Sequence, residues 1–69
     1  MAYTVTLKIP NISCGHCTMT IVRETKDLPG VEKVEGDVAN KTATFTLDNE
    51  MALNAVKHTL AEIGYPAEA

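Results

Sequence analysis

Both cysteines of the chain lie in the segment Ser13-Cys14-Gly15-His16-Cys17. Two thiols on one short turn can bind a soft metal ion, or they can join to each other as a disulfide. Two thiolates on a surface loop would leave a bound ion open to a third, incoming thiolate, as a transfer protein requires. Cys17 falls in the first turn of an expected helix, where free backbone N–H groups and the helix dipole favour a thiolate. Cys14, on the loop, is expected to be the more exposed sulfur.

The composition limits what this chain can do. Its 69 residues predict one small domain, residues 1–69, with little room for an enclosed active site, so we do not expect an enzyme. The net charge of −3 and the scattered basic residues argue against nucleic-acid binding. No apolar run approaches the ~20 residues of a membrane span, and no secretory leader is visible at the N-terminus. We therefore expect a cytoplasmic protein without membrane insertion, in which a cysteine pair serves metal binding or redox chemistry.

Hydrophobic periodicity predicts the elements that position the cysteines. Alternation indicates strands over residues 3–10, 31–38 and 42–47, and apolar stripes indicate a helix over 17–28 and a second one that starts after Asp48 or Asn49 and ends at Gly64. Residues 65–69 can supply a short fourth strand. The order predicts an α+β, ferredoxin-like βαββαβ fold, with a four-stranded antiparallel sheet and both helices on one face.

The cysteine segment and its surroundings resemble the heavy-metal-associated domain family, which includes copper chaperones and the metal-binding domains of copper-transporting P-type ATPases. The family motif is Gly-Met-Thr/Ser-Cys-x-x-Cys, and residues 11–17 here read Asn-Ile-Ser-Cys-Gly-His-Cys. Leu28-Pro29-Gly30-Val31 and Gly64-Tyr65 also match the family, so the resemblance covers nearly the whole chain. Ile12 can pack under the loop as the family methionine does, and Asn11 tolerates the positive φ that the family glycine would supply.

The resemblance implies a cytoplasmic copper chaperone that binds one Cu(I) through Cys14 and Cys17. It also implies transfer by thiolate exchange to the metal-binding domain of a copper-transporting P-type ATPase. The alternatives are that the chain is itself such an ATPase domain, or a carrier of mercury or another soft metal. We expect a monomer without metal. With copper, a bridged dimer can form, because a two-coordinate site can gain ligands from a second molecule. Zn(II), Ag(I) and Hg(II) are expected to bind the same pair in vitro.

Two rival functions use the same cysteines. Cys-Gly-His-Cys is also the active-site sequence of protein disulfide isomerases, but a thioredoxin-like fold needs roughly a hundred residues and no tryptophan precedes Cys14. A structural zinc site would need four ligands, for which only the two cysteines, His16 and His58 are available. We expect His16 to be a third ligand, a modulator of the thiolate pKa or a solvated loop residue.

Other side chains are candidates for a place near the metal loop. Family resemblance places Tyr65 beside the loop, where it can shield the thiols. Met19 is expected to be a partly exposed neighbour of the site, and Met51 to pack in the core. Lys8 and Arg23 could form a docking patch, although scattered basic residues usually only solvate a surface.

Overall fold

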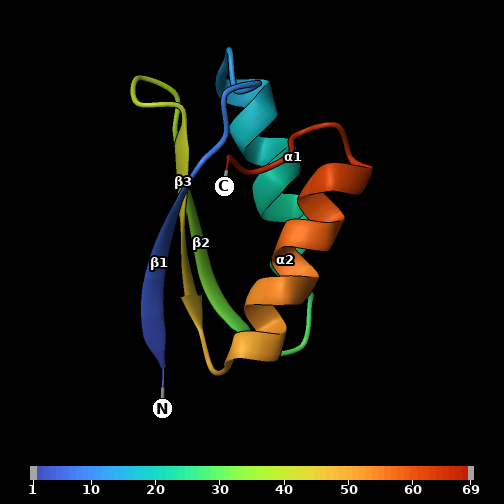
Figure 1. Cartoon of the computed structure of the whole chain (residues 1–69). Helices are drawn as coiled ribbons and strands as arrows, with labels where there is room; N and C mark the ends of the chain where they lie inside the picture. The colour runs from blue at the N-terminus through green and yellow to red at the C-terminus, as the bar shows by residue number, and fades with distance from the viewer. Residues whose placement is uncertain (1, 69) are drawn as a thin grey trace.

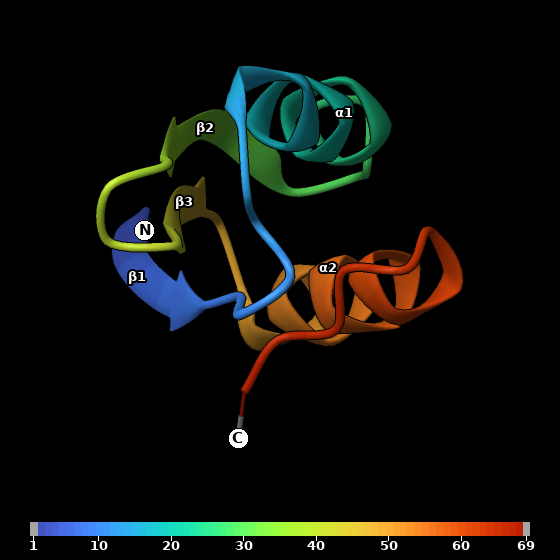
Figure 2. The ribbon, with the colours of Figure 1, turned by 90° about the horizontal axis from the view of Figure 1, so that it is seen from above.

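The computed structural model describes residues 2–68. Its elements follow in the order β1 (Tyr3–Lys8), α1 (Gly15–Thr25), β2 (Val31–Asp37), β3 (Thr42–Leu47) and α2 (Glu50–Glu62). The three strands form one antiparallel sheet in the order β1-β3-β2, and both helices lie on the same face of it (Figures 1 and 2). The predicted α+β class and the placement of the helices are therefore confirmed. Within residues 2–68, neither helix is long and apolar enough to cross a membrane.

The prediction of a fourth strand over 65–69 is wrong for the residues that the structure describes, and Ala69 lies outside them. Residues 65–68 run without strand geometry, and one backbone hydrogen bond, from the Glu68 N–H to the Lys8 carbonyl (2.7 Å), connects them to the end of β1. Pro66 has no N–H to donate and so interrupts any ladder along this short segment. The sheet is thus three-stranded.

The first helix begins earlier and ends earlier than the predicted span of 17–28. Cys14 is the N-cap, with extended backbone angles, and the helix runs from Gly15 to Thr25. Its early end follows from Pro29, because a proline disfavours helical geometry at the residue before it. Leu28 instead closes a turn, its N–H donating to the Thr25 carbonyl at 3.1 Å. The early start places both cysteines in the cap and first turn of one helix.

The core lies between the sheet and the two helices. The alternation of β3 is confirmed, since Ala43, Phe45 and Leu47 are fully buried and the intervening threonines are half-buried. The helices contribute Cys17, Ile21, Thr25, Ala52, Val56 and Leu60 to the buried set. Thr25 is accommodated because its hydroxyl donates to the Ile21 carbonyl at 2.6 Å. The scaffold of the cysteine segment is therefore a continuous apolar core.

The second helix is capped as the sequence predicts. The Asn49 side chain accepts a hydrogen bond from the Ala52 N–H (2.9 Å), and Gly64 follows the helix with a φ of 88°. The expectation that Met51 packs in the core is wrong, because its side chain is 80% exposed. Ala52 and Val56 direct α2 toward the core, and the neighbouring position 51 is rotated by about 100° from position 52, toward solvent.

Candidate metal-binding site

The loop that carries Cys14 is fixed by a buried side chain, Ile12, and by a hydrogen bond to Gly64 after α2. Ile12 is fully buried beneath it, as the sequence predicts, and its N–H donates to the Ile9 carbonyl at 3.1 Å. The Asn11 side-chain amide donates to the Gly64 carbonyl at 3.0 Å, which ties the loop to the end of α2. Asn11 is not among the positive-φ residues of the described chain, so its role is this hydrogen bond and not the expected left-handed backbone.

The two thiols lie side by side but in different surroundings. The Sγ atoms of Cys14 and Cys17 are 3.8 Å apart, and both cysteines are free. Cys14 is exposed at the N-cap, while Cys17 is only 7% exposed and belongs to the core cluster. A backbone hydrogen bond from the Cys17 N–H to the Cys14 carbonyl (3.1 Å) closes the turn between them. The expected contrast in exposure between the two sulfurs is confirmed.

The separation of the sulfurs suits one ion with room for a further ligand. With metal–thiolate bonds of about 2.3 Å, sulfurs 3.8 Å apart subtend an angle of about 110° at a shared ion. A linear two-coordinate ion with bonds of this length would need the sulfurs about 4.6 Å apart. The observed spacing therefore matches a bent pair that a third thiolate could complete, and linear coordination requires Cys14 to move outward.

The thiolate form of Cys17 is stabilised by polar neighbours. Hydrogen bonding from the Tyr65 hydroxyl, followed by the backbone and the hydroxyl of Ser13, lowers the pKa of Cys17 to about 6, against the opposing effect of burial. The Ser13 Oγ lies 3.6 Å from the Cys17 Sγ. The same hydrogen bond to Cys17, together with burial, raises the pKa of Tyr65. These neighbours thus favour the thiolate of Cys17 over the thiol.

Other candidate ligands do not join the cysteine pair. His16 is exposed, and no group of three or more Cys, His, Asp or Glu side chains within residues 2–68 could hold a metal ion together. His58 lies on α2, where its Nε2 is 2.6 Å from a carboxylate oxygen of Glu62. Among the described residues, a four-ligand zinc site is therefore not formed.

The residues expected around the site are only partly brought together. Met19 is 61% exposed on α1, as expected for a surface neighbour of the cysteines. Arg23 lines a hollow beside α1 with Lys26, and Lys8 is not part of that lining. Ser13 is the site residue that sequence reasoning did not assign a role. Its signal was its place four residues before Cys17, at the helix N-terminus, where a hydroxyl can reach a first-turn side chain.

The fold and the site together define a small α+β domain with a pair of free thiols at a helix N-terminus. The family model of the heavy-metal-associated domain matches residues 6–66, and the chain belongs to that family.

Relatives of this chain carry names that refer to two metals. A mercuric transport protein periplasmic component of Shewanella putrefaciens is 32% identical over 65 residues, covering 93% of this chain and 71% of that protein. A COP-associated protein of Helicobacter pylori (strain J99) is 27% identical over 60 residues, covering 87% and 91%. The solution structure of a putative copper-ion-binding protein from Bacillus anthracis str. Ames superposes with a TM-score of 0.89 at 30% identity, covering 99% and 97%. The chain is therefore similar both to a protein named for copper-ion binding and to one named for mercuric transport.

Proposed function

We propose that this protein is a cytoplasmic copper chaperone and not an enzyme. It binds one Cu(I) between Cys14 and Cys17 and passes it to the metal-binding domain of a copper-transporting P-type ATPase. The observation that carries the proposal is the pair of free sulfurs 3.8 Å apart, one exposed and one buried. Cu(I) is a soft ion that prefers thiolate ligands, and no carboxylate or imidazole among the described residues completes a harder site.

The different exposure of the sulfurs suggests an order of exchange. An incoming thiolate of the partner reaches the ion from the side of Cys14, forms a third metal–sulfur bond, and takes the place of the Cys14 thiolate. A second partner thiolate then displaces Cys17. Each partner thiol gives up its proton when it binds the ion, and Cys14 is free to take a proton from water once released. Cys17 can leave as a thiolate, because Tyr65 and Ser13 stabilise that form in the empty site.

Hg(II) transport is the second candidate, and the similarity to the Shewanella mercuric transport protein favours it. Hg(II) is also thiophilic, so the same pair of sulfurs would bind it. Binding alone therefore does not separate the two functions, whereas delivery does.

The experiment has a binding stage and a delivery stage. Cu(I) is titrated into the reduced protein against a competing chelator, and the mass of the intact complex is measured by mass spectrometry. We expect one ion per chain, and we expect Cys14→Ser and Cys17→Ser each to lose tight binding. Wild-type affinity in either variant would exclude the paired site.

For delivery, protein loaded with Cu(I) or with Hg(II) is mixed with a metal-binding domain of a copper-transporting ATPase. Rapid transfer of Cu(I) supports the copper function. A chain that binds Cu(I) but does not release it to that domain, and that does deliver Hg(II) to a thiol acceptor, would favour the mercury carrier.

A further inference from the structure

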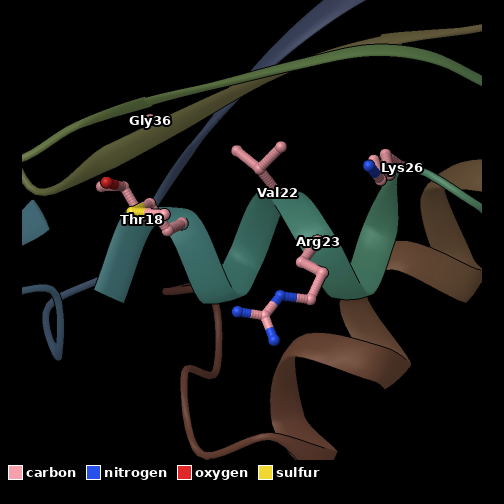
Figure 3. A pocket seen from close by; sticks show the side chains of 6 residues that line it. Thr18, Val22, Arg23, Lys26 and Gly36 are labelled. Carbon is pink, nitrogen blue, oxygen red and sulfur yellow. The ribbon is translucent and has the colours of Figure 1, made fainter. Parts of the chain in front are cut away.

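Gly36 lies where β2 comes closest to the start of α1. A Cβ atom added to Gly36 would stand 2.4 Å from the Cβ and 2.6 Å from the Cγ2 of Thr18, and 3.4 Å from its Cα. Figure 3 shows Thr18 at the end of α1 that lies near the strand labelled Gly36. The first two distances are shorter than contacts between non-bonded carbon atoms in proteins. Any side chain at position 36 must therefore push the first turn of α1 away from the sheet.

The backbone of Gly36 does not itself call for glycine. Gly30 and Gly64 are the glycines with positive φ, and Gly36 pairs in regular register with Ala43 of β3. A glycine within a regular strand weakens it and often marks a place where another segment comes close. Here the close segment is α1.

Thr18 connects this contact to the metal loop. It follows Cys17 directly in the chain, and its hydroxyl donates a hydrogen bond to the Gly15 carbonyl at 2.9 Å. Gly15 lies between the two cysteines, and a Cβ there would meet nothing within 4 Å. No neighbouring segment therefore packs against Gly15 itself, and the contact of Thr18 with β2 is what seats this turn of α1 on the sheet.

We propose that Gly36 and Thr18 are positioning residues for the cysteine pair. The missing side chain at Gly36 admits Thr18 against β2, and the Thr18 hydroxyl holds the Gly15 carbonyl. Together these contacts set where the buried Cys17 sulfur stands relative to the exposed Cys14 sulfur. The role in metal transfer rests on the proposed function, but the spacing of the thiols is a property of the metal-free protein.

The first test uses no metal. The equilibrium between the Cys14–Cys17 dithiol and its disulfide is measured against reduced and oxidised glutathione, because this ratio reports how favourably the two sulfurs are placed. We expect Gly36→Ala to change the equilibrium constant by about threefold or more. Val56→Ala, in the core on α2, is the control that lowers stability without touching the loop. It should leave the equilibrium constant unchanged.

Circular dichroism and thermal melting check that each variant is folded. If Gly36→Ala does not fold, Thr18→Val is measured in its place. This change keeps the volume of the side chain and removes only its hydrogen bond to the Gly15 carbonyl. It should shift the glutathione equilibrium in the same assay. A folded Gly36→Ala protein with the wild-type equilibrium constant would overturn the proposal, as would an equal shift in Val56→Ala. A wild-type value for Thr18→Val would overturn the link through Gly15.

Cu(I) competition on the same variants separates this inference from the proposed function. We expect Gly36→Ala to lower the Cu(I) affinity. If the wild-type protein fails to bind Cu(I) while the glutathione equilibrium still responds to Gly36→Ala, the copper function fails and the positioning role stands. If the wild type binds Cu(I) and neither measurement responds, the positioning role fails alone.

Discussion

The hydroxyl of Tyr65, just after α2, is the strongest influence that lowers the pKa of Cys17 in the first turn of α1. Next to Tyr65 in the chain, the Gly64 carbonyl accepts a hydrogen bond from the Asn11 side chain in the loop that carries Cys14. The end of α2 therefore contributes both to the geometry of the loop and to the charge state of one thiol.

Replacing Tyr65 by Phe should raise the pKa of Cys17. The hydroxyl is the largest of the influences that lower that pKa to about 6, and the ring that fills the space is retained. The measurement is ultraviolet thiolate absorbance against pH, in a Cys14→Ser background so that one thiol is observed. Tyr3→Phe is the matched control, because the Tyr3 hydroxyl donates to the Asn49 carbonyl and not to a cysteine. An unchanged midpoint in Tyr65→Phe would show that the hydroxyl does not stabilise the thiolate.

The metal-free protein should become less stable as the pH falls toward 6. The pKa of Cys17 is lowered from an ordinary 9.0 to about 6 in the folded protein, so the unfolded chain binds more protons between these values. The contribution is complete above about pH 9, declines through this window and is lost below about pH 6. Urea unfolding at a series of pH values, with reductant and a chelator present, measures it.

Cys17→Ser provides the comparison for the pH series. Its stability should depend less on pH across the same window, because it has no thiol to titrate. Parallel curves for the two proteins would contradict the lowered pKa.

Folding should not require metal. Fully buried side chains from both helices and from the central strand form the core, whereas the sulfurs occupy only its edge. Cys14→Ser and metal removal should therefore leave a cooperative melt and the same circular dichroism. Phe45→Ala, in the centre of the sheet, should cost about 3–5 kcal/mol. A metal-free protein without secondary structure would instead make the metal part of the fold.

The replacement His16→Ala should change the Cu(I) affinity by less than about tenfold, roughly 1.4 kcal/mol. His16 is exposed and belongs to no three-ligand group within the described chain, so in the proposed site the ion is held by Cys14 and Cys17 without it. Chelator competition gives the affinity, and size exclusion of the copper-loaded protein shows any change in association. A larger loss of affinity would make His16 a ligand and would contradict the two-coordinate site.

Most of the fold could be predicted because each element carries its own periodic signal. The alternation through Phe45 and the Asn49 cap were sufficient for β3 and the start of α2. The fourth strand failed because its weak pattern depended on pairing with β1, and Pro66 removes a donor that such pairing needs. The ends of α1 depend on the extended backbone of Cys14 at the N-cap position and on Pro29, which periodicity does not report.

The cysteine pair could be singled out from the sequence, but the contacts around it could not. Cys14 and Cys17 stand out by type and spacing, and helix geometry explains why Cys17 is buried. The contacts of Gly36 with Thr18 and of Asn11 with Gly64 join residues that are distant in the chain. No local pattern encodes such contacts, since they arise only when the helices are seated on the sheet.

Alkylation at limiting reagent should label Cys14 before Cys17. Two properties of the thiols favour opposite orders of labelling. Cys17 has the stabilised thiolate but is only 7% exposed, whereas Cys14 is exposed at the N-cap of the helix. A thiolate must be reached before it can react, and a stabilised thiolate is also a weaker nucleophile, so access decides the order. Peptide mapping after brief treatment of the reduced, metal-free protein measures it. Unfolding in urea should remove the preference. Earlier labelling of Cys17 in the folded protein would mean that the buried sulfur opens the exchange, and would reverse the proposed order of release.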